Sequence, residues 1–257
     1  MSDGQDLARA YLEQQRLLGG DAVILPISEP LPVPASEPLT ARPPDRPTAA
    51  SEDLPPPGVS YDPPSGDLFT ADPVSQAATV AAIADLVSGC TKCRLCEGRT
   101  HTVPGEGAED ARLVVVGEGP GRVEDETGRP FVGPAGELLT KILAAIDLPR
   151  ERVFICNVVK CRPPENRQPQ YDEIAACLPY LHRQIQILKP KVILAMGNTA
   201  AQTLLNTKQS LGSMRNHVHR FRGTPVIVTY HPAALLRNPN WKRPTWDDVR
   251  IARRLLD

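Results

Sequence analysis

Cysteine residues carry the first sign of chemistry in this 257-residue sequence. Cys90 and Cys93 form a CxxC pair in the polar stretch SGCTKCRLC, and Cys161 and Cys177 follow in two later segments. Four thiolates from separate segments can ligate a zinc ion or an iron–sulfur cluster, and their spacing alone does not choose between them. Cys96 extends the pair to CxxCxxC, so a different triplet of ligands also stays open.

The alternative interpretation is that all six cysteines are unlinked thiols. Cys156 fits it best, because it lies inside the apolar run VFICNVV, where a small buried side chain is expected. The N-terminus lacks a basic start followed by an apolar block, so it does not resemble a secretory signal. We therefore expect a cytoplasmic protein in a reducing compartment, in which disulfides are rare.

A glycine-rich loop follows the first strongly apolar run of the chain. Residues 117–136 read GEGPGRVEDETGRPFVGPAG and lead into a helical pattern. A dinucleotide-binding GxGxxG motif would need glycine where Arg122 stands, and no GK[ST] phosphate-binding motif is present in the sequence. We expect a loop whose glycines let the backbone approach a ligand, with Glu118 at its base and Phe131 as a stacking surface. A tight turn with Phe131 in the core is the alternative.

Polar residues also lie within or at the end of two of the later apolar runs. Asn157 interrupts VFICNVV and needs hydrogen-bond partners, which a ligand or the neighbouring backbone would supply. A lone histidine at a strand end, such as His231, is more often structural than catalytic. In an open parallel sheet, however, ligands bind where the carboxyl ends of the strands meet. We expect these strand-end residues to meet there: Glu118, Asn157, Gly197 and His231.

The elements that must position these side chains alternate along the chain. Four continuously apolar runs are predicted to be strands covered on both faces, at 113–117, 153–159, 192–197 and 225–231. Helical patterns flank them at 75–89, 135–146, 171–188, 198–205 and 245–256. The alternation predicts a three-layer αβα fold of the α/β class, in which helices cover both faces of a central, mostly parallel four-stranded sheet.

The N-terminal third differs in composition from the rest. Half of the 28 prolines fall between residues 26 and 73, and residues 1–75 hold four basic and twelve acidic side chains. We predict an acidic, largely disordered tail over 1–75 and a compact domain over 76–257. A short helix at 5–18 is either a docking segment for a protein partner or, as we favour, a frayed helix with none. No run approaches 18 apolar residues, so a membrane span is not expected.

The compact domain is basic, with 25 basic against 18 acidic side chains. Several basic residues flank the loops described above, namely Arg162, Arg167, Arg237, Lys242 and Arg243. Basic loops around a polar pocket indicate a phosphate-backbone partner, such as a nucleic acid. His217 and His219 have the spacing of a metal pair, although an exposed hairpin edge explains them better.

Taken together, the motifs resemble the family-4 uracil-DNA glycosylases, the iron–sulfur branch of that superfamily. The resemblance spans about residues 87–256 and leaves out the proline-rich tail. It rests on the four-cysteine spacing and on GEGPG at 117–121, ED at 124–125, GRPFVGPAG at 128–136, NVVKCRPPENR at 157–167 and HPAALLR at 231–237. It implies a monofunctional enzyme that flips uracil out of DNA and hydrolyses its N-glycosidic bond, leaving an abasic site for base excision repair.

The resemblance also implies which residues read the base. Asn157 would form paired hydrogen bonds with the Watson–Crick edge of uracil, and Phe131 would stack on its ring. The Gly119 backbone and Glu124 would line the pocket, with Glu124 on the side that excludes the methyl group of thymine.

Other residues would act on the bond and on the DNA. His231 would stabilise the negative charge that develops on the departing base, and Glu118 would position water or stabilise the sugar cation. Leu235, Leu236 and Arg237 would enter the gap left by the flipped nucleotide.

The implied cofactor is one 4Fe–4S cluster with a structural role, held by Cys90, Cys93, Cys161 and Cys177. The implied partner is uracil-containing DNA, single- or double-stranded, bound by a monomer. Two other classes stay open, a non-enzymatic nucleic-acid-binding module with a structural zinc and a redox protein. The first would release no free base, and the second would cycle its cluster readily and ignore uracil.

Overall fold

The computed structural model describes residues 54–63 and 72–257. The chain divides into two units, Met1–Leu54 and Pro55–Asp257, and the second contains nearly all of the described residues. Most of the predicted tail therefore lies outside the described residues, including the helix predicted at 5–18 that would dock a protein partner. None of the described helices is long and apolar enough to cross a membrane.

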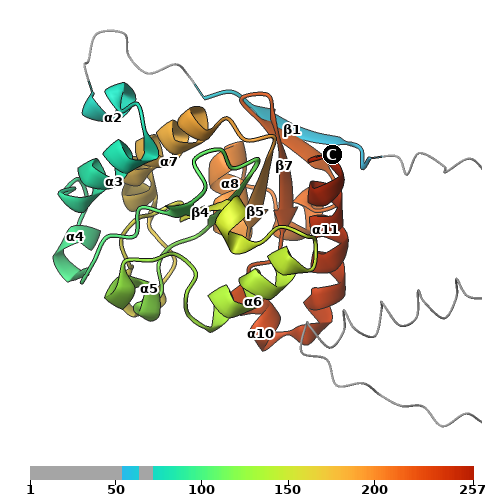
Figure 1. Cartoon of the computed structure of the whole chain (residues 1–257). Coiled ribbons are helices and arrows are strands. Elements are labelled where there is room, and N and C mark those ends of the chain that lie inside the picture. The colour runs from blue at the N-terminus through green and yellow to red at the C-terminus, as the bar shows by residue number, and fades with distance from the viewer. Residues whose placement is uncertain (1–53, 64–71) are drawn as a thin grey trace, which may run out of the picture. The chain divides into compact units, whose positions relative to one another are not determined.

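A seven-stranded sheet forms the centre of the second unit, in the order β1-β6-β7-β5-β3-β4-β2 (Figure 1). Its four central strands are parallel: β3 (Leu113–Gly117), β4 (Phe154–Asn157), β5 (Val192–Met196) and β7 (Thr224–Thr229). These are the strands that the apolar runs predict, although β4 is shorter. Nearly all of their residues are buried, as expected for strands covered on both faces.

The predicted number of four strands is wrong, because three further strands extend the edges of the sheet. β2 (Glu106–Gly107) pairs antiparallel with β4, and β6 (Val218–Phe221) pairs antiparallel with β7. β1 (Pro57–Tyr61) pairs parallel with β6. Each of these segments is short or carries polar residues, so none has the continuous apolar run that marks a central strand.

Strand β1 lies within the tail predicted at residues 1–75 to be largely disordered, but its residues are ordered in the sheet. Val59 and Tyr61 pack against the core, and the backbone N–H of Val59 donates a 2.8 Å hydrogen bond to Nδ1 of His219. Gly58 permits this approach, because a Cβ at that position would lie 2.4 Å from the same nitrogen. The hairpin predicted at His217 and His219 is present as β6–β7, but His219 is buried rather than exposed.

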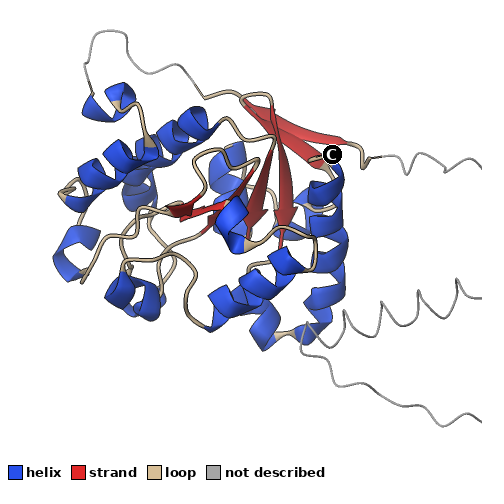
Figure 2. Cartoon of the chain, viewed as in Figure 1, coloured by secondary structure: helices blue, strands red, loops and turns tan. Residues whose placement is uncertain are grey.

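Helices cover both faces of the sheet (Figure 2). One layer contains α3 (Val80–Ser88), α7 (Tyr171–Leu188) and α8 (Asn198–Leu205), whose apolar side chains share a core with alternate residues of β3 and β5. The opposite layer contains α6 (Pro134–Ala144), α10 (Pro232–Arg237) and α11 (Lys242–Arg254). In that layer α11 packs on β7 and β5, and α10 packs on α6. The predicted three-layer αβα arrangement is confirmed.

Short elements fill the connections between these layers. They are α2 (Pro73–Gln76), α4 (Leu95–Gly98), α5 (Arg122–Thr127), α9 (Leu211–Met214) and the 3-10 turns η1 (Arg150–Arg152), η2 (Pro164–Asn166) and η3 (Pro239–Trp241). The helix predicted at 75–89 is divided into α2 and α3. The division occurs because the side chain of Thr79 caps the start of α3 by accepting a hydrogen bond from the Ala82 N–H.

Candidate active site

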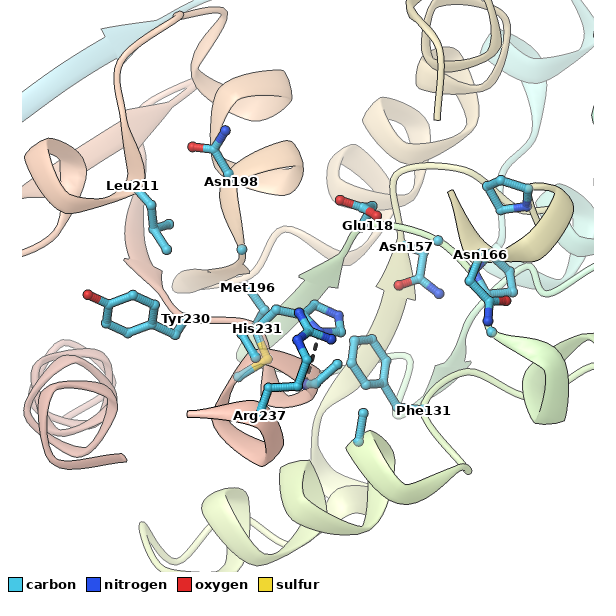
Figure 3. A pocket seen from close by; sticks show the side chains of 18 of the residues that line it. Glu118, Phe131, Asn157, Asn166, Met196, Asn198, Leu211, Tyr230, His231 and Arg237 are labelled. Carbon is cyan, nitrogen blue, oxygen red and sulfur yellow. Dashed lines mark hydrogen bonds between the residues drawn. The ribbon is translucent and has the colours of Figure 1, made fainter. Parts of the chain in front are cut away.

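A cavity of about 720 Å³ lies at the carboxyl ends of the central strands (Figure 3). Its wall includes one residue at or just after each strand. They are Glu118 after β3, Asn157 at the end of β4, Gly197 after β5 and His231 after β7. The fold therefore brings together the four strand-end residues that the sequence places at one edge.

Asn157 has an acceptor without a partner. Its side chain is 1% exposed, and its Oδ1 accepts no hydrogen bond from any described residue. Gly117 leaves room for it, since a Cβ there would lie 2.5 Å both from Asn157 Oδ1 and from the tip of the Phe131 ring. Leaving a buried acceptor unpaired costs roughly 1–3 kcal/mol. A ligand that carries an N–H group would satisfy it.

Phe131 is both buried and part of the cavity wall, so its burial does not keep it from the site. Its backbone is in the left-handed region at φ 52°, which a bulky residue adopts only when its surroundings hold it there. Arg150 supplies that hold, donating a 2.8 Å hydrogen bond to the Phe131 carbonyl and pairing with Glu106 at 2.9 Å. The ring lies 5.4 Å from the ring of His231, centroid to centroid.

Glu124 and Gly119 shape the wall near the glycine-rich loop. Oε1 of Glu124 accepts hydrogen bonds from the N–H groups of Val132 and Gly133, both at 2.9 Å, at the point where the chain enters α6. Gly119 lies against a side chain, since a Cβ there would be 2.8 Å from Cγ2 of Val159. Both residues line the cavity.

His231 is held as a neutral ring by the start of α10. Its Nδ1 accepts a 3.2 Å hydrogen bond from the Ala233 N–H, so the ring proton belongs on Nε2. Burial, together with the positive charge of Arg237, lowers the pKa of His231 to about 4, against a smaller opposite effect of Glu124. At neutral pH the residue thus offers an uncharged N–H donor.

Glu118 is oriented by two residues that sequence reasoning missed. Thr199 Oγ1 donates a 2.5 Å hydrogen bond to Glu118 Oε2, and Gln168 Nε2 donates to the same hydroxyl at 3.1 Å. Thr199 is 3% exposed. It lies in the first turn of α8, two residues beyond Gly197, and its position just after a central strand is the signal that would have identified it.

Further parts of the wall were also missed. These lining residues are Asn166, Met196, Asn198, Ser210, Leu211, Tyr230 and Trp241. Met196, Asn198 and Tyr230 are neighbours of predicted positions at strand ends. Ser210 and Leu211 begin α9, which no sequence pattern indicates.

The three residues predicted to contact DNA differ in accessibility. Leu235 is 1% exposed, because α10 turns that side chain into the protein, so this structure does not support the prediction that it enters the DNA. Leu236 is 50% exposed. Arg237 is exposed and lines the cavity. The two accessible residues lie at the end of α10, beside the site.

A second, small cavity is lined by five cysteines: Cys90, Cys93, Cys96, Cys161 and Cys177. Nitrogen donors point at two of them. Arg99 Nη1 donates to Cys161 Sγ and the Lys160 N–H donates to Cys177 Sγ, both at 3.3 Å. Within the described ranges, no three His, Cys, Asp or Glu side chains converge on the position of a single metal ion. The thiols instead surround the cavity from separate points, and Cys156 is buried elsewhere, as expected.

Lys160 connects the two cavities. Its side chain is fully buried, and Nζ donates to the Asn157 carbonyl at 2.9 Å and to Gln184 Oε1 at 2.6 Å. Its backbone N–H is the donor to Cys177. One residue thus holds both the strand end that carries Asn157 and a wall of the cysteine cavity.

Comparisons with known proteins give consistent matches. The model of the uracil DNA glycosylase superfamily matches residues 104–251. The type-4 uracil-DNA glycosylase of Sulfurisphaera tokodaii is 46% identical over 182 residues, covering 67% of this chain and 83% of the relative. That of Thermotoga maritima is 47% identical over 178 residues, covering 68% of this chain and 93% of the relative. That of Pyrobaculum aerophilum is 48% identical over 163 residues, covering 60% of this chain and 83% of the relative.

Proposed function

Because the chain belongs to the type-4 branch of the uracil-DNA glycosylase superfamily, we propose that the cavity at the strand ends is its uracil-binding active site. The enzyme is a monofunctional hydrolase that removes uracil from DNA and leaves an abasic site, which starts base excision repair. The glycosidic bond is out of reach inside a duplex, so the uracil nucleotide must first leave the base stack.

The unpaired Oδ1 of Asn157 is the observation that carries this assignment. The Watson–Crick edge of uracil has an N3–H donor beside a carbonyl acceptor, which matches the acceptor and donor of one carboxamide. Asn157 accepts from N3–H and donates to O4 in this arrangement. Cytosine has an acceptor where uracil has N3–H, so the same amide disfavours it.

The rest of the pocket supports the ring and limits its size. Phe131, held by Arg150, stacks on the flipped base. Glu124 fixes the loop that faces the C5 edge of the base, where thymine carries its methyl group. Since Glu124 is tied to two backbone N–H groups, this wall does not yield easily to the extra methyl.

Bond cleavage leaves an anionic base and a cationic sugar, and the site has a group for each. The neutral Nε2–H of His231 donates to O2 of uracil as negative charge develops there. Glu118 stands on the sugar side, where its carboxylate stabilises the oxocarbenium ion or holds the attacking water. The hydrogen bond from Thr199 sets the orientation of that carboxylate in either role.

The type-4 branch implies an iron–sulfur cluster, and the cysteine cavity fits it. Cys90, Cys93, Cys161 and Cys177 would hold it. Four thiols from three segments surround the cavity without converging on one point, which suits a cluster with one cysteine per iron better than a single zinc ion. The cluster would supply structural cross-linking rather than electron transfer, because glycosidic hydrolysis transfers no electrons. We further propose that the enzyme acts as a cytoplasmic monomer on single- or double-stranded DNA.

An excision assay tests the proposed function. The protein is incubated with an end-labelled oligonucleotide that contains one uracil, and strand breaks are measured after alkali treatment. We expect breaks at the uracil position and none in a control oligonucleotide with thymine there. Binding of the uracil oligonucleotide without alkali-labile sites would instead identify a non-enzymatic DNA-binding protein.

A further inference from the structure

Three side chains form a stack along one wall of the active-site cavity. The rings of Tyr230 and Trp241 are nearly parallel, with centroids 4.7 Å apart and planes inclined by 6°. The guanidinium carbon of Arg215 lies 4.7 Å from the centroid of the Tyr230 ring. Tyr230 and Trp241 line the cavity, and Trp241 is 37% exposed, so the stack ends in an accessible aromatic surface.

The base of this stack is rigid. Arg215 forms two hydrogen bonds with Asp248, at 2.7 and 3.0 Å, and a third with the Pro244 carbonyl at 2.9 Å. Asp248 is fully buried and also accepts a 2.7 Å hydrogen bond from Thr229, the last residue of β7. A ring held in place before binding loses little conformational entropy when a ligand stacks on it.

The stack lies outside the part of the cavity that reads uracil. Figure 3 shows Tyr230 on one side of His231, with Asn157 and Phe131 on the other side. The cavity volume of about 720 Å³ is in the range that holds a whole drug-sized ligand, much larger than one pyrimidine ring. A uracil bound at Asn157 and Phe131 therefore leaves the region beside Tyr230 and Trp241 available.

We propose that Trp241, backed by Tyr230, is a stacking platform for the base that adjoins the flipped uracil on the same strand. This proposal rests on the proposed function, since it takes uracil-containing DNA as the ligand. A flipped nucleotide stays covalently joined to its neighbours, so an adjacent base can reach another wall of the same cavity. Every nucleobase has an aromatic face, and the platform therefore tolerates any neighbouring base.

A mutant cycle between protein and DNA tests the platform. Trp241→Ala removes the aromatic surface, and Trp241→Phe keeps a smaller one. Tyr171→Ala is the matched control, because Tyr171 is another exposed aromatic residue, 87% accessible, that does not line the cavity. Single-stranded substrates carry one uracil with normal neighbours, with a tetrahydrofuran spacer on its 5′ side, or with that spacer on its 3′ side.

On the substrate with normal neighbours, we expect Trp241→Ala to lower kcat/KM about 10-fold. Trp241→Phe should lower kcat/KM much less, and Tyr171→Ala should have the kcat/KM of the wild type. When the spacer replaces the neighbour that stacks on Trp241, on either the 5′ or the 3′ side, kcat/KM of the wild type should fall by a similar factor. On that substrate Trp241→Ala should lower kcat/KM no further. This non-additivity on a single strand is the signature of the contact.

Two results would overturn the platform. An equal loss from Trp241→Ala on all three substrates would make Trp241 a structural residue. No loss from Trp241→Ala on the single-stranded substrate with normal neighbours would show that no base of the same strand stacks on Trp241. Failure of the wild type to release uracil from any substrate would instead contradict the proposed function, so the two failures can be told apart.

Discussion

The hydroxyl of Thr199 donates a 2.5 Å hydrogen bond to Oε2 of Glu118, and this contact joins the loop after β3 to the first turn of α8, 81 residues later in the chain. Gln168 donates to the same hydroxyl from the loop before α7. The direction of the Glu118 carboxylate is therefore set before a substrate arrives. Such preorganisation is the main way in which a polar site lowers the barrier of a reaction that develops charge.

The first prediction concerns this contact. Thr199→Val keeps the shape of the side chain and removes the hydroxyl, so Glu118 loses its orienting donor. We expect a roughly 10- to 100-fold lower single-turnover rate with nearly unchanged DNA affinity, because a hydrogen bond to a charged group contributes about 1.5–3 kcal/mol. Thr199→Ser should restore most of the rate. An equal loss in the Val and Ser variants would show that packing, and not the hydroxyl, is what matters.

Asn157→Ala should abolish base reading while leaving DNA binding intact. The variant loses both hydrogen bonds to the base, and we expect about a 100-fold slower release of uracil, given roughly 0.5–1.5 kcal/mol for each bond and more where the partner is left unpaired. Excision is measured under single-turnover conditions, and affinity by titration of a labelled oligonucleotide. A parallel loss of affinity would mean that Asn157 holds the fold or the DNA.

The lowered pKa of His231 predicts a specific pH dependence of stability. The unfolded chain takes up a proton at this residue below about pH 6.5, but the folded protein does so only near pH 4. The unfolded state thus binds more protons between these values, and the free energy of unfolding falls as the pH decreases. Relative to His231→Gln, the wild type should lose about 2 kcal/mol more between pH 7 and pH 5.

Chemical denaturation at several pH values measures this difference. His182 and His219 also have lowered pKa values because they are buried, but both are present in the two proteins and cancel in the comparison. In the excision assay, His231→Gln should be strongly impaired at every pH. Parallel stability curves for wild type and variant would contradict a neutral His231 in the folded state.

The cysteine cavity predicts the metal content of the protein. Anaerobically purified wild type should contain iron and inorganic sulfide, each near four per chain, and be brown. Cys161→Ser should lose both, whereas Cys96→Ser should keep them, because Cys96 is the lining thiol outside the proposed ligand set. One tightly held zinc ion without sulfide would rule the cluster out. Loss of iron in the Cys96 variant would change the ligand set.

Strand β1 predicts an effect of a small substitution far from the active site. Gly58→Ala places a Cβ where the ring of His219 lies, 2.4 Å from Nδ1, and should lower the free energy of unfolding by roughly 1–3 kcal/mol. Gly89→Ala is the control, since a Cβ at that exposed position would have no atom within 4 Å. Thermal melts of the two variants give the comparison. Equal melting temperatures would mean that β1 does not depend on this contact.

The extent of successful prediction differs between the centre and the edges of the fold. The four central strands are continuous apolar runs because helices cover both of their faces. Such runs can be recognised from the sequence alone. Strand β6 pairs with β7 in a local hairpin. Strands β1 and β2 instead owe their conformation to pairing with strands that are distant in sequence, β6 and β4 respectively. The local composition around β1 predicts disorder, because it contains no information about a pairing partner elsewhere in the chain.

The site divides in the same way. The order of residues along the chain already determines that Glu118, Asn157 and His231 share one edge, because parallel strands bring their carboxyl ends together. It does not determine which side chains touch. Packing in three dimensions buries Leu235 while leaving Leu236 exposed, aims Thr199 at Glu118, and stacks Trp241 on Tyr230 in the wall of the active-site cavity. These contacts depend on side-chain direction and on distances between loops, which only the folded chain sets.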